Sequence, residues 1–181
     1  MDRFIDHVIP QTPGCPKSLM KIELLRGAIE FCRDSHIWQI DAETEVLADA
    51  STITLTIADE STVTGCRLSI SSKAFNQYTR SGVTVTLDNA VTSDTTFEVT
   101  TFLKPDRAAT GLPDILYDDW FEAIESYAKY SLMMMPEKTW SNPQLARINY
   151  SKYLEDLGSA KIKAMQTNDQ TRLMVQQRSF V

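Results

Sequence analysis

The spacing of apolar side chains changes twice along the chain. From residue 15 to about residue 39, apolar residues recur near helical spacing, with charged residues largely between them. Because proline suits the first helical turn, the pattern predicts a helix that opens at Cys15 or Pro16 and continues to about Gln39. Residues 2–13 contain two prolines and are expected to form a short lead.

Between residues 45 and 103 the apolar residues alternate with polar ones instead. Ile53, Leu55 and Ile57 alternate with threonines, and turn-forming residues separate this run from similar runs further along the chain. Threonine suits the outer face of a sheet. The pattern predicts about four antiparallel strands with one buried face.

Helical spacing returns after Pro113. A helix is expected to start at Pro113 or Asp114 and to end against Pro136, which cannot continue it. One stripe on this helix comprises Leu116, Trp120, Ile124, Tyr127 and Ser131. Ser141 or Asn142 is then expected to cap a last helix, which has Pro143 in its first turn and fades near residues 167–168.

These patterns predict an α+β fold, a three-helix bundle with an inserted small antiparallel β-sheet domain and an extended C-terminal arm. The lead and the first bundle helix occupy residues 1–40, and the inserted β-domain occupies residues 41–104. The two further bundle helices occupy residues 105–166. Residues 167–181 form the arm, which lacks a helical stripe and is too apolar to be a purely solvating tail.

Charge is distributed unevenly along the chain, whose net charge is -6. Residues 41–103 carry nine acids and three bases, whereas residues 159–181 carry one acid and four bases. An acidic body does not hold nucleic acid by neutralising phosphates. The asymmetry indicates either an ordinary solvated surface or head-to-tail complementarity between neighbouring copies.

The composition and the N-terminus favour a soluble globular protein. No apolar run approaches the roughly 18 residues that span a bilayer, and the first residues lack the apolar core of a signal peptide. The three cysteines, Cys15, Cys32 and Cys66, are far apart and are expected to be reduced thiols.

Few residues suggest catalysis or metal binding. His7 and His36 are the two histidines, and neither has a candidate nucleophile or metal ligand near it in the sequence. Adjacent residues on a helix point about 100° apart, so Asp118 and Asp119 are not expected to share a site. The sequence therefore predicts no enzyme activity, no cofactor and no metal.

Two features leave alternatives open. Met133, Met134 and Met135 fit either a core position at a helix end or an adaptable contact surface. For function, the alternatives are a small helical enzyme or metal-binding protein that uses the Asp118–Asp119 pair, and a DNA-packaging or regulatory accessory factor. The acidic balance argues against the second.

Three segments resemble one protein family. They are VIPQTPGCPKSLMKIELLRGAIEFCRDSHIWQ (8–39), LPDILYDDWFEAIESYA (112–128) and MMMPEKTWSNPQLARINYSKYLEDL (133–157). They look like phage head-to-tail adaptor proteins, also called head-completion or connector proteins, which are distantly like the tubular tail protein A of short-tailed phages. The residues that carry this signature and the expected bundle core are Trp38, Leu116, Trp120, Ile124, Pro136, Trp140, Pro143 and Leu145.

The resemblance implies a structural virion protein at the head–tail junction, made in the host cytoplasm. Such a protein forms a dodecameric ring under the portal and continues the DNA channel used in genome ejection. Its partners are the portal protein, further copies of itself and the next tail component, a nozzle or stopper. DNA passes without specific binding, and no membrane is involved.

The resemblance also implies that the C-terminal arm reaches the portal. The residues expected to dock there are Arg172, Leu173, Met174, Val175, Arg178 and Phe180. An extended segment that orders on binding, and that adds a strand to a neighbour, fits their pattern.

Overall fold

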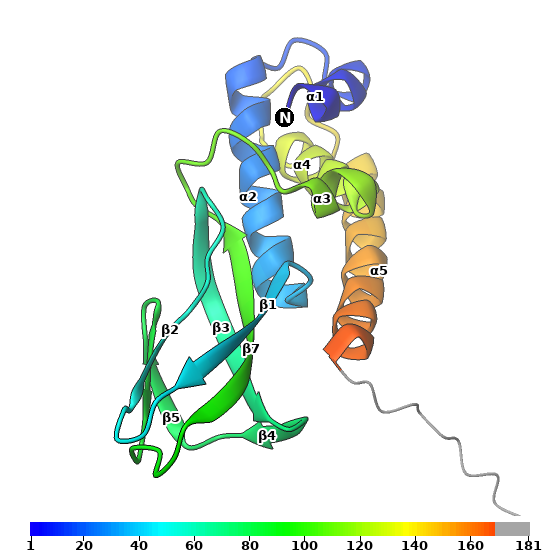
Figure 1. Ribbon diagram of the computed structural model, residues 1–181. Helices are drawn as coiled ribbons and strands as arrows, with labels where there is room; N and C mark the ends of the chain where they lie inside the picture. The colour runs from blue at the N-terminus through cyan, green and yellow to red at the C-terminus, as the bar shows by residue number, and fades with distance from the viewer. Residues whose placement is uncertain (169–181) are drawn as a thin grey trace, which may run out of the picture.

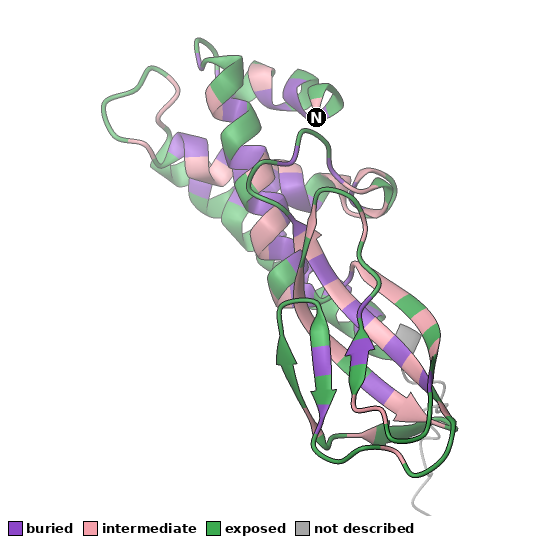
Figure 2. Ribbon diagram, turned by 60° about the vertical axis from the view of Figure 1, so that its left-hand side comes forward, coloured by how far each residue is buried: buried purple, intermediate pink, exposed green. Residues whose placement is uncertain are grey.

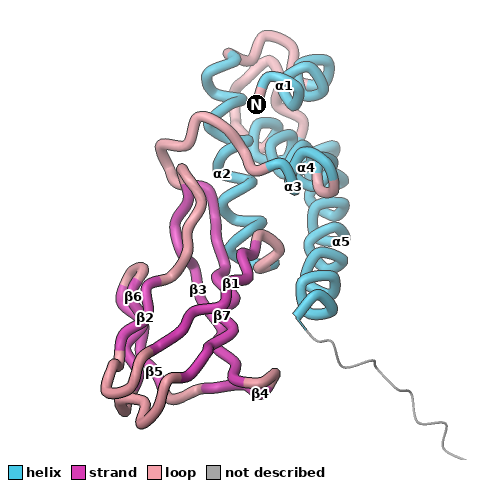
Figure 3. The backbone as a smooth tube through the Cα atoms, in the orientation of Figure 1, coloured by secondary structure: helices cyan, strands magenta, loops and turns pink. Residues whose placement is uncertain are grey.

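The computed structural model describes residues 1–168, which fold into a helical part and a β-sheet part (Figure 1). The predicted α+β class is confirmed. Figure 3 shows the helices gathered at one end of the molecule and the strands at the other. No helix within the described range combines the length and the hydropathy that crossing a membrane requires.

The first residues, for which the sequence predicted only a short lead, form a helix. Helix α1 spans Asp2–Val8, and a 3₁₀ turn, η1, spans Ile9–Gln11. Phe4 is fully buried and stacks on Phe121, with 4.2 Å between the ring centroids. The two prolines of this region follow α1, where they end a helix without preventing one.

Helix α2 spans Lys17–Ser35, with Pro16 at its N-cap. It ends four residues before the predicted end at Gln39. His36 adopts the left-handed conformation, with φ of 55°, and its N–H donates to the Cys32 carbonyl at 3.0 Å. This C-terminal cap turns the chain out of the helix and towards the sheet.

The helix predicted after Pro113 is interrupted. Helix α3 spans Asp114–Asp118 and helix α4 spans Phe121–Met133. Trp120 lies between them with φ of -127°, which is not helical. The break places the Trp120 ring against Phe31 of α2, with 5.5 Å between the ring centroids, so packing overrides the continuous apolar stripe.

Helix α5 spans Pro143–Asn168, as the sequence predicted. The Asn142 side-chain oxygen accepts a hydrogen bond from the Leu145 N–H at 3.1 Å, which satisfies one of the first unpaired donors of the helix. The Asn142 carbonyl accepts from the Ala146 N–H at 2.9 Å. The Asn142 cap and Pro143 therefore together determine where the helix begins.

Helices α2, α4 and α5 contact one another around the helical core, and α1 contacts α2 and α4. Figure 2 shows buried residues on the facing sides of these helices. Gly27 of α2 faces Tyr127 of α4 so closely that a Cβ atom at Gly27 would lie 2.7 Å from Tyr127 Cδ1. The absence of a side chain at Gly27 thus lets the two helices approach.

The sheet part has seven strands in two antiparallel sheets, so the prediction of about four strands was wrong. The larger sheet has the order β1-β7-β3-β4, formed by Gln39–Val46, Thr95–Pro105, Ser61–Ile70 and Lys73–Phe75. The smaller sheet has the order β2-β6-β5, formed by Thr52–Thr54, Thr84–Leu87 and Tyr78–Ser81. Strands β4 and β5 have only three and four residues, too few for alternation to define them, whereas β2 and β6 lie within alternating runs.

A second core lies between the two sheets. Phe97 and Val99 of β7, Leu68 of β3 and Val85 of β6 are buried in it. The sheet part joins the helical part mainly through α2 and β7. At this junction the Leu103 N–H donates to the Trp38 carbonyl at 2.9 Å.

Candidate functional site

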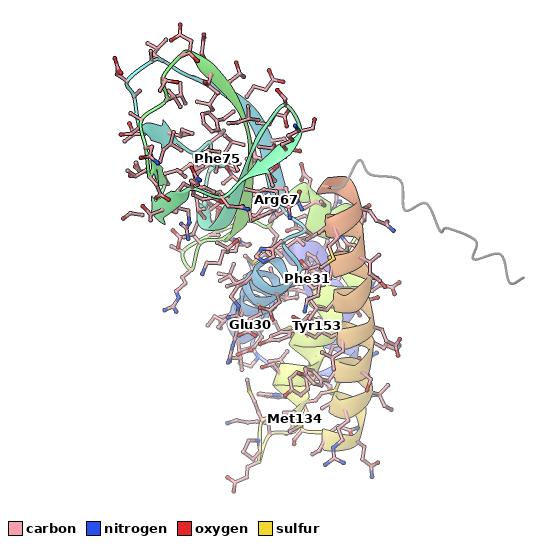
Figure 4. All side chains as sticks on the ribbon, turned by 90° about the horizontal axis from the view of Figure 1, so that it is seen from below. Glu30, Phe31, Arg67, Phe75, Met134 and Tyr153 are labelled. Carbon is pink, nitrogen blue, oxygen red and sulfur yellow. The ribbon has the colours of Figure 1, made fainter. Side chains whose placement is uncertain are left out.

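A groove of about 400 Å³ lies where the larger sheet meets the helical part. Its residues come from the end of α2 (Asp34, Ser35, His36), from β1, β3 and β7 (Gln39, Arg67, Phe102) and from α5 (Lys161, Ala164, Met165). Figure 4 labels Arg67 at this junction. The groove brings together segments that are far apart in the sequence, so no local motif could have predicted it.

The Phe102 ring has two basic side chains near it. The His36 ring centroid is 4.9 Å from that of Phe102, and the Arg67 guanidinium carbon is 6.0 Å from it. A cation near an aromatic face is attracted by the ring. The groove therefore has an aromatic wall with basic groups around it, which suits contact with a carboxylate of a partner.

The outward face of the larger sheet is acidic. This acidic sheet face comprises Asp41, Glu43 and Glu45 of β1 and Glu98 of β7. Glu43 lies directly opposite Glu98, and like charges in that position destabilise a sheet. The Thr100 hydroxyl donates to Asp41 at 2.6 Å, and the Ser69 hydroxyl donates to Glu98 at 2.8 Å. Acids at the alternate positions 41, 43 and 45 could have predicted this face from the sequence, but a count of the acids and bases in residues 41–103 ignores their spacing.

Helix α5 presents apolar residues to solvent. This exposed α5 face comprises Ile148, Leu154, Ile162 and Met165, with exposed fractions of 55%, 46%, 59% and 68%. Gly158 lies within the same face, and a Cβ atom added there would meet nothing within 4 Å. A group of large exposed apolar residues on one helix is typical of a contact surface.

The signature residues predicted from the sequence serve packing and helix boundaries. Leu116 and Ile124 are fully buried in the helical core. Trp38, Trp120 and Trp140 are partly buried against it, Leu145 is half-buried, and Pro136 and Pro143 are exposed. Because they are spread over α3, α4, α5 and the connecting segments, they do not form one site.

The three consecutive methionines divide between the two roles considered for them. Met133 is fully buried and Met135 is partly buried against the helical core. Met134 is 46% exposed at the C-terminal cap of α4. The segment is therefore part core and part surface.

The predicted portal-docking residues lie outside the described residues. This applies to Arg172, Leu173, Met174, Val175, Arg178 and Phe180, and to the arm from residue 169 onward. The described chain ends on α5 beside the groove, since Ala164 and Met165 line it. The last turns of α5 that the structure describes therefore lie beside the groove, which the larger sheet also lines.

The histidines and the aspartate pair make ordinary contacts. His7 Nδ1 is 3.9 Å from Glu125, and Asp119 accepts a hydrogen bond from Lys163 Nζ at 2.6 Å. Within residues 1–168, no three His, Cys, Asp or Glu side chains are placed to hold a metal ion. The cysteines are unbridged, and burial raises the pKa of the Cys32 thiol to about 12.

Comparison with known proteins adds no relative. No protein-family model matches the chain, and no curated protein matches it. Three surfaces are candidates for contact with another molecule, which are the groove, the acidic sheet face and the exposed α5 face.

Proposed function

We propose that the protein is a structural component of a phage virion that forms a ring at the head–tail junction. The observation that carries this proposal is the exposed α5 face, where four large apolar side chains meet solvent along one helix. Burying them between copies would remove apolar surface from water, the dominant favourable contribution to most protein association. The resemblance of residues 8–39, 112–128 and 133–157 to head-to-tail adaptors supplies the biological setting.

The arrangement of a three-helix bundle with an inserted β-domain is part of this proposal. The mutual contacts of α2, α4 and α5 support it. So does the separation of the helical core from the core between the sheets. In such a ring the helical part packs side by side with its neighbours, and the β-domain projects from it.

Contacts around a ring are heterologous, so two different surfaces of each copy must meet. The exposed α5 face is one such surface, and a different, complementary surface of the neighbouring copy would cover it. Portal protein above, the next tail component (a nozzle or stopper) below and neighbouring copies in a dodecameric ring are the proposed partners. Where an acidic surface lines the channel, it repels DNA and lets it slide.

Portal docking by the arm is tested with a shortened chain. A chain that ends at Asn168 keeps both cores and should remain a folded monomer. The full chain is expected to sediment with portal rings of the same phage, whereas the shortened chain is expected to stay in the supernatant. Equal sedimentation of the two chains would remove the arm from the proposal.

A further inference from the structure

The side of α2 that points away from the helical core also carries apolar residues. Ile22 is 60% exposed and Ile29 is half-buried, and the two lie on one side of the helix, about 10.5 Å apart along its axis. Arg26 lies between them, and its side chain is 60% exposed. Leu24 and Phe31, on the opposite side, are fully buried. We call Ile22, Arg26 and Ile29 the α2 ridge.

The exposed α5 face has an acid at its centre. Glu155 is exposed and lies midway between Ile148 and Ile162, which are 55% and 59% exposed. A partner that covers the two isoleucines also removes the Glu155 carboxylate from water, and a buried charge needs an opposite charge beside it. The surface that covers this face must therefore be apolar and must contain a base. The α2 ridge has both properties.

The spacing of residues on the two helices also agrees. When α2 and α5 are set side by side in the same direction with Arg26 opposite Glu155, each isoleucine of the α2 ridge falls opposite a small residue of α5. The pairs are Ile22 with Ser151 and Ile29 with Gly158. A Cβ atom added at Gly158 would meet nothing within 4 Å, so a side chain from another molecule has room there.

The fold gives the two helices the directions that this register requires. Both α2 and α5 begin at the end of the helical part that is farthest from the sheets, and their C-terminal ends line the same groove (Figure 1). They therefore run parallel within one copy. Neighbouring copies in a ring of many subunits differ by a small rotation, so α2 of one copy is also nearly parallel to α5 of the next.

We propose that the α2 ridge of each copy packs against the exposed α5 face of the next copy, with Arg26 beside Glu155. The inference rests on the proposed function, because it names the contact that closes the proposed ring. Two different surfaces meet, as a heterologous contact requires. Burial of the isoleucines drives the association, and the pair of opposite charges sets the register.

Exchanging the two charges tests the contact. Arg26→Glu and Glu155→Arg each place like charges opposite one another, so the fraction of portals that carry a ring should fall at least about tenfold in each single variant. The variant that combines both substitutions restores opposite charges across every contact and should form rings again. Lys73→Glu, an exposed charge reversal on β4, is the control and should assemble as the wild type does.

A substitution that adds no charge tests the same contact by shape. Gly158→Leu fills the space expected to receive Ile29, and it should abolish rings on portals. The single chain should remain folded, because position 158 is open and leucine favours a helix more than glycine does. Circular dichroism checks that the variant is folded.

The outcomes separate this contact from the proposed function. Rings from the wild type and from the charge-exchanged variant, but not from the single variants, would support the contact. Normal rings from the single variants or from Gly158→Leu would overturn the contact and leave the ring in place. So would a charge-exchanged variant that leaves portals as bare as the single variants do. Portals left bare by the wild type would overturn the proposed function and the contact together.

Discussion

Gly27 sets the distance between α2 and α4. In the sequence it is one residue within a helical stripe, where glycine normally lowers stability. The structure gives the reason for it, because Tyr127 occupies the space that a side chain would need. Sequence reasoning could find neither this contact nor the left-handed His36, since both depend on packing between distant segments. The Asn142 cap could be predicted because its partner lies three residues away.

Replacing Gly27 with alanine tests this contact. A Cβ atom 2.7 Å from Tyr127 Cδ1 forces the helices apart, so Gly27→Ala should lower the free energy of unfolding by about 1–3 kcal/mol. Gly158→Ala is the matched control in an open helical position and should raise it by about 0.5–1 kcal/mol. Urea unfolding followed by circular dichroism measures both. A Gly27→Ala protein as stable as the wild type would contradict the close approach.

At the scale of elements, α5 has more apolar surface than its own chain covers. Ala146, Tyr153 and Ala160 are buried against the rest of the helical part, which accounts for one face of the helix. Ile162 lies on the opposite side and Leu154 on the flank of the helix, and both are exposed. The helix itself was predictable from its cap, its proline and its length, but which of its apolar residues face solvent was not. Exposure depends on where α2 and α4 lie, which the local sequence does not specify.

The strands were harder to predict from the local sequence than α5 was. The long strand β7 alternates strictly and was recognisable, whereas β4 and β5 are too short to show a period. Every second residue of β1 from Asp41 to Glu45 is an acid, so the sequence suggested a charged region and did not suggest a strand. The acidic sheet face was thus visible only as an acidic region.

A double substitution on α5 tests whether its exposed face makes contacts. Leu154→Asp combined with Ile162→Asp replaces largely solvent-exposed side chains, so the free energy of unfolding should fall by only about 1–2 kcal/mol, mainly through the lower helix propensity of aspartate. Ring formation on portals should nevertheless be lost, because the apolar contact between copies is replaced by charge. Asn76→Asp, an exposed position in the sheet part between β4 and β5, is the control and should assemble normally. Normal rings from the double variant would show that α5 is not the contact.

For the whole molecule, the proposed function depends on how three surfaces are arranged around two cores. The groove and the C-terminal end of the exposed α5 face meet at Met165, which belongs to both. The α+β class could be predicted from the two changes of hydrophobic period. The meeting of α2, β3, β7 and α5 at the groove could not, since each contributes only one to three residues to it.

Imaging of portal rings mixed with the purified full chain tests the central claim most directly. Because a portal can template assembly, a protein that is monomeric in solution should still add a ring of density at one end of the portal, coaxial with its channel. The proposal predicts this added ring at saturating protein concentration. Portals that stay bare under the same conditions would contradict the assignment as a head-to-tail adaptor.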